Sequence, residues 1–233
     1  VDLGDPDTGV AAAVVSSKLF GGVFGGGVID NFSISEKGNY VAVHVTSAFT
    51  DSVSGASYAA GIHCFAAATF AAMSFSSNSH GGGGSLLTDQ QSHMCMAVDS
   101  AGVERLVMIG GANYGIFSVR MDTGASRTEV AASKFGNAGH LCGVMHGYAL
   151  FSQHAWSPYA FESSKAYHQK IFFCKLDGSG GVHTVCQPHH AEDGVYSYDE
   201  QTNASCSRDG AYVLFNSTWE THGRTECYLA RSA

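Results

Sequence analysis

The 233-residue sequence is poor in charged residues and proline, and it has no cluster of basic side chains. Charged residues make up 14% of the chain, and the net charge is −8 with no run of Lys and Arg, which argues against a nucleic-acid partner. No uninterrupted apolar run approaches the ~18 residues of a membrane-spanning helix, so we expect no transmembrane segment. A hydrophobic fraction of 45% nevertheless excludes a disordered chain.

Several short motifs with known chemistry are also absent. No C-x-x-C pair occurs among the 7 cysteines, which argues against a zinc ribbon or a thioredoxin-like site. The glycine run that ends at Ser85 lacks the Lys of a phosphate-binding loop, and no G-x-S-x-G sequence is present to anchor a hydrolase nucleophile. The cysteines are expected to be buried small hydrophobic residues at strand positions.

Short β-branched and aromatic runs, each bounded by Gly, Asp or Ser, dominate the chain and predict an all-β fold. The expected strands cover residues 40–45, 106–109, 115–119, 148–152, 170–174 and 212–216. One Ala-rich stretch, 66–73, could form a helix. The glycine tracts at 21–27 and 81–84 are expected to be exposed loops or flexible connections.

Two elements alternate in a fixed order along the chain. The first is a turn centred on a glycine and followed by a strand, and its glycines are Gly38, Gly102, Gly147 and Gly210. The second is a strand with a D-x-G-type hairpin, spaced roughly 55 to 58 residues apart. Because one four-stranded sheet cannot bury both of its faces, this alternation predicts radially stacked sheets, a β-propeller. A β-sandwich, which also has short strands at regular spacing, is the alternative.

We therefore predict a single β-propeller domain over 1–233, with about four to five blades of four antiparallel strands. The blades are assigned to residues 28–88, 89–134, 135–190 and 191–233, with 1–27 as a partial blade or closing strand. Because the chain starts with Val1 rather than Met, we expect a processed product or a piece of a larger propeller. Low charge, few Lys and many Ser, Thr and Gly favour a secreted, periplasmic or cell-surface location.

The segment 203–217, N-A-S-C-S-R-D-G-A-Y-V-L-F-N-S, resembles the S-x-D-G-x-x-[VL]-x-F-x-S repeat of bacterial Tol-type β-propellers and of oligogalacturonate lyases. Residues 30–41 are a second match, and 139–142 and 175–180 are also similar to that group. The resemblance covers most of 28–233 loosely. It implies propeller blades in a protein outside the cytoplasm, and it points to no single activity.

Polar residues recur where the strand before each turn glycine begins. In a propeller this strand is the innermost one, so these side chains would converge at one mouth of the central channel, where water, each other or a ligand must satisfy them. We expect a ligand-binding site there, formed by Asp30, Asn31, His93, His140, Gln201 and Asn203. Since neutral imidazoles suit several divalent metals, His93, His140 and Gln201 are also a candidate metal site.

The likeness to oligogalacturonate lyase implies a metal held by channel histidines and a glutamine, with a histidine as catalytic base. His140 and Gln201 fall in comparable places, so His93 and His140 are the candidates for a catalytic role. The His-Pro-His that the lyases place before their last repeat is Thr202-Asn203-Ala204 here.

Three functions follow from these observations. The first is a binding or assembly module for a glycan or a protein partner, in which the aromatic residues Trp156 and Tyr159 could stack on sugar rings. The alternative is a metal-assisted polysaccharide lyase. The third is a self-assembling protein, because low surface charge favours homo-oligomers.

Overall fold

The computed structural model describes residues 29–52, 54–90, 93–110, 115–134, 139–153, 167, 169–189, 201–219 and 225–232. In this part of the chain the regular structure consists of β-strands and one short 3-10 helix, η1 (Ala132–Lys134). No helix among the described residues is long and apolar enough to cross a membrane. The chain divides into two compact units, of which unit 1 contains Val1–Gln91 with Met121–Gly124, and unit 2 contains Ser92–Arg120 with Ala125–Ala233.

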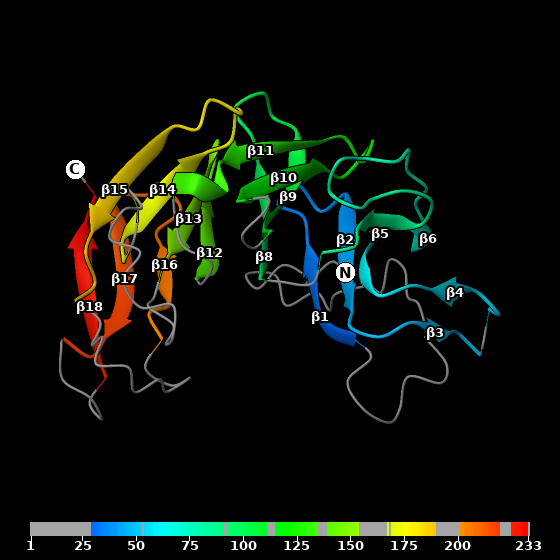
Figure 1. Ribbon diagram of the computed structural model, residues 1–233, viewed down its shortest axis with the longest axis horizontal. Helices are drawn as coiled ribbons and strands as arrows, with labels where there is room; N and C mark the ends of the chain where they lie inside the picture. Colours follow the sequence, from blue (N-terminus) through cyan, green and yellow to red (C-terminus); the bar gives the residue numbers. More distant parts are fainter. Residues whose placement is uncertain are drawn as a thin grey trace, which may run out of the picture. The chain divides into compact units, whose positions relative to one another are not determined.

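Unit 1 is built on a five-stranded antiparallel sheet in the order β1-β2-β5-β6, with β7 also paired to β5 (Figure 1). The strands are β1 (Ile29–Ile34), β2 (Tyr40–Val45), β5 (Gly61–Ala66), β6 (Ala71–Ala72) and β7 (Leu86–Thr88), beside the two-stranded pair β3 (Phe49–Thr50) and β4 (Ser57–Tyr58). Three valines of β2 pack with Tyr58 and Phe65 into the core of this unit.

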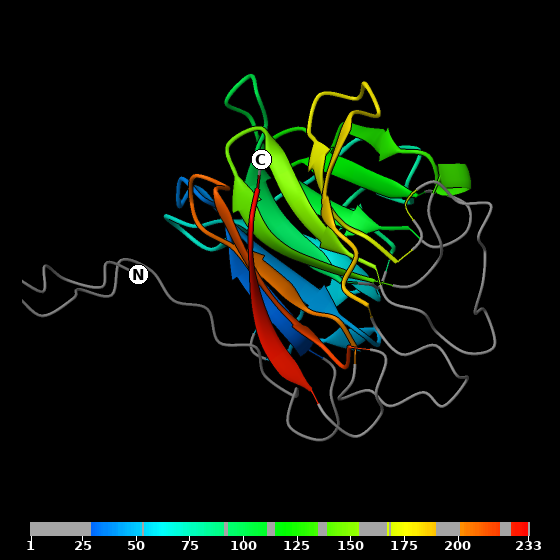
Figure 2. The same ribbon diagram turned by 90° about the vertical axis from the view of Figure 1, so that its left-hand side faces the viewer.

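Unit 2 contains three antiparallel sheets, in the orders β11-β10-β9-β8, β12-β13-β14-β15 and β16-β17-β18 (Figure 2). Their strands are β8 (Met94–Val98), β9 (Glu104–Ile109), β10 (Ile116–Arg120), β11 (Ser126–Val130), β12 (His140–Met145), β13 (Tyr148–Ser152), β14 (Ile171–Lys175), β15 (Val182–Cys186), β16 (Ala204–Cys206), β17 (Tyr212–Ser217) and β18 (Glu226–Arg231).

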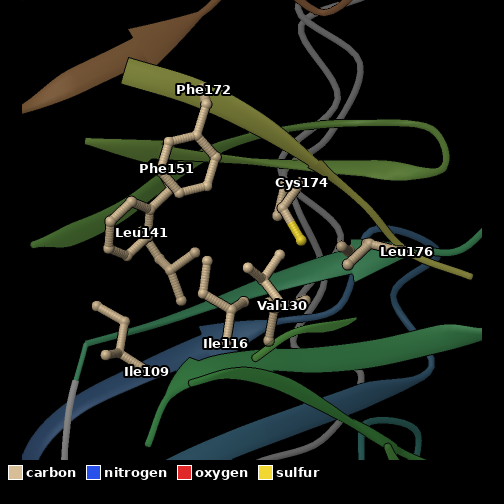
Figure 3. Close-up of a cluster of buried hydrophobic side chains, with 11 residues drawn as sticks. Ile109, Ile116, Val130, Leu141, Phe151, Phe172, Cys174 and Leu176 are labelled. Carbon is tan, nitrogen blue, oxygen red and sulfur yellow. The ribbon is translucent and has the colours of Figure 1, made fainter. Parts of the chain in front are cut away.

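The sheets of unit 2 pack face to face in series, and two buried clusters lie between them. The first cluster, which we call the Phe151 core, joins the β8–β11 sheet to the β12–β15 sheet. Figure 3 shows Phe151 and Phe172 on one side of it, facing Ile116 and Val130 on the other. The second cluster, the Phe173 core, consists of Leu150, Ile171, Phe173, Ala204, Val213 and Phe215. Because successive strand residues point to opposite faces, Phe151 enters the first core and its neighbour Leu150 enters the second.

A network of charged side chains is buried in the β8–β11 sheet of unit 2. Arg105 donates through Nε to Asp99 Oδ2 at 2.6 Å and through Nη1 to Ser118 Oγ at 3.1 Å. The Ser118 hydroxyl donates to Glu129, which also accepts from Arg127 Nε at 2.7 Å and from the Gly178 N–H at 2.7 Å. The network therefore connects β9, β10 and β11 with the turn that follows β8, and it reaches the turn between β14 and β15.

The turn glycines are equivalent in conformation. Gly38, Gly102, Gly147 and Gly210 have φ angles of 73°, 79°, 81° and 70°, a region that glycine enters without steric cost. In three of these turns the glycine N–H donates to the carbonyl three residues earlier, at 2.8 to 2.9 Å. Gly147 differs, because its N–H donates to the Val98 carbonyl of the neighbouring sheet at 2.8 Å.

These observations confirm the all-β class and the antiparallel sheets, and two of the four main sheets have the predicted four strands while the others have five and three. The predicted strands 40–45 and 148–152 coincide with β2 and β13, and the four main sheets fall inside the four ranges assigned to blades. The division into one domain and the closure of a propeller stay predictions.

One local expectation was wrong, and two others hold only in part. The candidate helix at 66–73 is a turn followed by β6, in which Phe70 has a φ of 52°. In the tract 81–84, Gly81 and Gly84 are exposed as expected, but Gly82 is buried and backbone hydrogen bonds join Phe75 to Gly84; the tract 21–27 lies outside the described residues. The six cysteines whose side chains are described lie at strand positions and form no disulfide, but only Cys64 and Cys174 are buried, and Cys227 is exposed.

Candidate functional site

One edge of the last two sheets of unit 2 collects polar side chains. His140 begins β12 opposite Ser152, which ends β13, and Ser152 lies opposite Ile171, which begins β14. Glutamines 153 and 169 lie next to these strand ends, and Gln201 lies in the segment before β16. We call this group the polar edge; it consists of His140, Ser152, Gln153, Gln169, Gln201, Thr202, Asn203 and Asn216.

A buried imidazole lies at the centre of the polar edge. His140 Nε2 is 2.6 Å from Gln201 Oε1, and both side chains are buried. Because an amide oxygen only accepts hydrogen bonds, this contact places the proton of the neutral ring on Nε2. Burial lowers the pKa of His140, the bond to Gln201 opposes that shift, and His93 adds to it. His140 is therefore a neutral donor at pH 7, with the exposed His93 ring at 4.3 Å between ring centroids.

Two asparagines hold the backbone of Gln201 in place. Asn216 Nδ2 donates to the Gln201 carbonyl at 2.8 Å, and Asn216 Oδ1 accepts from the Asn203 N–H at 2.6 Å. Asn216 comes from β17, so the end of this strand fixes the segment that carries Gln201. Ser152 adds a further link by donating to the Thr202 carbonyl at 3.0 Å.

Three buried polar atoms of the polar edge have no hydrogen-bond partner: Gln153 Oε1, Gln169 Nε2 and Thr202 Oγ1. Leaving a buried polar group unsatisfied costs about 1–3 kcal/mol, so such atoms mark places where a polar ligand or ordered water would bind. The Gln153 oxygen accepts hydrogen bonds, the Gln169 nitrogen donates them, and the Thr202 hydroxyl can do both. None of these three side chains is charged. The polar edge is therefore suited to an uncharged polar ligand.

The structure brings together only part of the predicted site. His93, His140 and Gln201 are neighbours, and Asn203 joins them through its bonds with Gln201 and Asn216. Asp30 belongs to unit 1, where its carboxylate is 3.1 Å from His44 Nδ1.

The backbone of Asn31 pairs with the same His44. The grouping of Asp30 and Asn31 with the residues of unit 2 stays a prediction. Trp156 and Tyr159 lie outside the described residues.

Sequence analysis missed Ser152, Gln153, Gln169, Thr202 and Asn216. The signal that could have found them is their position, since the two glutamines flank the predicted strands 148–152 and 170–174. The prediction considered only the strand that precedes each turn glycine, whereas neighbouring antiparallel strands bring both starts and ends to one edge.

The metal site at His93, His140 and Gln201 stays a prediction. Among the residues described, no group of three or more His, Cys, Asp and Glu side chains is placed to hold a metal ion. The bond to Gln201 occupies Nε2 of His140, so a metal would have to displace Gln201 or bind the other ring nitrogen.

A groove of about 340 Å³ lies at the other end of the β12–β15 strands, still within unit 2. Tyr148 and Phe173 meet edge to face in its wall, with ring centroids 6.5 Å apart, and His183 and Asp209 add polar groups. Asp209 is already engaged by Ser207 Oγ at 2.6 Å and by the Ala211 N–H at 3.0 Å. Since turn contacts occupy this carboxylate, the polar edge is the better candidate for polar recognition.

Acidification is expected to destabilise the protein. Burial lowers the pKa of His63, His80 and His140 below the ordinary 6.5, so the folded state binds fewer protons than the unfolded chain. The stability from these neutral rings is fully present above pH ~6.5 and falls as the pH drops below that value.

We expect the thermal unfolding midpoint to be lower at about pH 5.5 than at about pH 7.5, and the His140→Gln variant to show a smaller difference. An equal or higher midpoint at the acidic pH in the unmodified protein would contradict this expectation.

Comparisons with known proteins do not assign the chain to a family. No protein-family model matches it, and no curated protein sequence matches it. Among solved structures it is similar to a chain from a structural and mechanistic study of two prolyl endopeptidases, with 16% identity and a TM-score of 0.40. The match covers 88% of this chain and 27% of that chain, so this chain spans about a quarter of the other's length. At this level of similarity it supports no conclusion about activity.

Proposed function

We propose that this chain is a propeller-type binding module, placed outside the cytoplasm, that recognises an uncharged glycan at its polar edge. The observation that carries the proposal is the set of three buried polar atoms without partners at the polar edge, which also contains the His140–Gln201 pair. A sugar presents hydroxyl groups that both donate and accept. It would therefore satisfy the amide oxygen of Gln153, the amide nitrogen of Gln169 and the Thr202 hydroxyl together.

The electrostatics of the polar edge agree with a neutral ligand. His140 is uncharged at pH 7 because burial lowers its pKa, and Gln201 orients it through the bond to Nε2. Asn216 Nδ2 and Asn203 Nδ2 both donate to the Gln201 carbonyl and so hold its backbone before any ligand arrives, which reduces the entropy lost on binding. His93, exposed beside His140, is the group best placed to contact the ligand from the solvent side.

A glycan array probed with the full chain, followed by calorimetric titration of the oligosaccharides it retains, tests this proposal. We expect Gln201→Ala and Gln153→Ala to weaken binding at least tenfold, or about 1.4 kcal/mol. Gln90→Ala is the matched control, because Gln90 lies in unit 1 and its side chain bonds to Asp89. Equal affinity in all four proteins, or binding of protein partners alone, would contradict the glycan assignment.

A metal-assisted polysaccharide lyase is the second candidate, and the adjacent imidazoles of His93 and His140 are the observation that favours it. Such an enzyme requires a bound divalent cation and a base near the sugar C5. Its test is the appearance of unsaturated uronates when the chain is mixed with acidic polysaccharides and a divalent metal. Absence of product with every metal tried would exclude this candidate.

A further inference from the structure

Four aromatic rings of unit 2 form a continuous column at the end of β17. The ring centroids of Phe215 and Tyr228 are 5.7 Å apart, and those of Tyr228 and Trp219 are 5.0 Å apart. The His189 ring follows, with its centroid 4.7 Å from that of Trp219. We call these four residues the aromatic column. It begins in the Phe173 core, where Phe215 is 5% exposed, and it reaches solvent at Trp219, which is 52% exposed.

The backbone holds the two outer rings of the aromatic column in an unusual conformation. Trp219 and His189 have φ angles of 46° and 52°, a region that bulky residues rarely enter. Ser217 fixes this geometry, because its hydroxyl accepts from the Trp219 N–H at 2.9 Å and donates to the Pro188 carbonyl. Strained backbone persists only where surrounding contacts enforce it, and it is most frequent at functional sites. The conformation of Trp219 therefore points to a role for its ring beyond packing.

The aromatic column lies at the same end of β17 as the polar edge. Asn216 belongs to the polar edge and donates to the Gln201 carbonyl at 2.8 Å. Trp219 follows Asn216 by three residues, which span about 11 Å at most when the chain is extended. A ligand that covers the Trp219 ring is therefore within reach of the polar edge.

The exposed indole of Trp219 defines one part of such a ligand. Among the described residues its ring N–H has no hydrogen-bond partner, so it is available to an acceptor on a ligand. A pyranose has C–H groups on the face of its ring and hydroxyl groups around the rim. It can cover the apolar indole with its face and accept from the ring N–H with a hydroxyl.

Two other ligands that stack on tryptophan fit these surroundings less well. A nucleotide carries a phosphate, but the polar edge contains no Lys or Arg to neutralise it, and the chain has a net charge of −8. A proline-rich peptide also packs on tryptophan, but proline has no N–H to donate to the unpaired Gln153 oxygen. A neutral sugar supplies an apolar face, donors and acceptors together.

We propose that Trp219 is the stacking platform of the binding module, on which one ring of a neutral oligosaccharide lies while a neighbouring ring bonds to the polar edge. This inference rests on the proposed glycan function and narrows the ligand to a chain of at least two sugars with an open C–H face. Tyr228 and His189 hold the indole before the ligand arrives, which reduces the entropy lost on binding.

Calorimetric titration of the full chain with cellohexaose, mannohexaose and xylohexaose tests this platform. We expect Trp219→Ala to bind the preferred hexasaccharide at least tenfold more weakly, and Trp219→Phe, which keeps an aromatic ring, to lose less. Tyr212→Ala is the matched control, because Tyr212 is 48% exposed at the opposite end of β17 and should leave the affinity unchanged. Circular dichroism and the thermal midpoint show that each variant is folded.

Tryptophan fluorescence is a second measurement, which a purely structural role for Trp219 would not change. The chain contains 2 tryptophans, so Trp219→Phe leaves only Trp156. On saturation with the hexasaccharide, the emission of the unmodified chain should move to shorter wavelength, because the sugar replaces water at the indole. The same shift in Trp219→Phe would show that the Trp219 ring is not covered, and so would an unchanged emission in the unmodified chain.

The failure of this inference can be distinguished from the failure of the proposed function. If the unmodified chain and folded Trp219→Ala bind a hexasaccharide equally, the platform is refuted and the glycan function stands. If neither the hexasaccharides nor any glycan of the array binds, both are refuted. Weaker binding in Trp219→Ala, with full affinity in Gln153→Ala and Gln201→Ala, supports the platform and refutes the polar edge. Binding of poly-L-proline that Trp219→Ala abolishes, without binding of any hexasaccharide, overturns the sugar assignment.

Discussion

Replacing Asp99 with alanine is expected to lower the free energy of unfolding by about 3–5 kcal/mol, because it leaves the buried Arg105 guanidinium without its carboxylate. Both side chains are buried, and their closest atoms are 2.6 Å apart. Burial alone would raise the pKa of Asp99. The hydrogen bonds from Arg105, Val103 and Ala101 and the charge of Arg105 outweigh it, so the pKa lies below its usual value. Urea denaturation followed by circular dichroism measures the loss.

The control for this variant is an ion pair of similar geometry at the surface. Lys175 Nζ lies 2.7 Å from Asp177 Oδ2, but both side chains are partly exposed to solvent. Because water screens this pair, Asp177→Ala should leave the denaturation midpoint almost unchanged. If Asp177→Ala lowered the free energy of unfolding as much as Asp99→Ala, burial of the ion pair would not be what determines the size of the loss. Replacing Asp99 and Arg105 together by apolar residues should recover part of the stability, since no buried charge then remains unpaired.

Truncation of Phe172 to alanine has a comparably large expected effect, a loss of about 3–5 kcal/mol in the free energy of unfolding. Phe172 is fully buried in the Phe151 core, beside Phe151 (Figure 3). Its ring centroid lies 4.9 Å from that of Phe151 and 5.2 Å from that of Tyr167. Without the ring, the protein loses the free energy gained by moving it from water into the core. A cavity also remains, because the strands of the two sheets that line the core cannot move together to fill it.

Phe32→Ala is the matched control for this variant. The Phe32 side chain is mostly exposed, so its truncation removes little buried surface and should change stability by far less. Chemical denaturation of both variants gives the comparison. A similar loss in the two would mean that the Phe151 core does not stabilise the protein more than an exposed ring does.

Much of the local structure was predictable because it depends on neighbours in the sequence. Short apolar runs predict β2 and β13. Gly38, Gly102 and Gly210 predict turns because glycine adopts the positive φ that such a turn requires without steric cost. The helix predicted at 66–73 is not formed, because local preference is outweighed there by pairing with another strand. Its Ala residues favour a helix in isolation, but pairing of β6 with β5 outweighs that preference.

The candidate site was only partly predictable. His140 and Gln201 are 61 positions apart and were expected to meet because both precede a repeated strand. Gln153 and Gln169 join them only because β13 and β14 pair in one register, and no local pattern reports which strand ends share an edge.

The sequence by itself determined where several of the strands and turns of this protein lie, since alternation of apolar residues and glycine conformations act over a few residues. The tertiary structure decided which face of each strand is buried and which further side chains join the candidate site. Leu150 and Leu214 occupy the same place in the nearly identical segments 148–152 and 212–216, yet one is buried and the other is half exposed. The physical reason is that burial depends on the surface packed against a face, and that surface comes from distant parts of the chain.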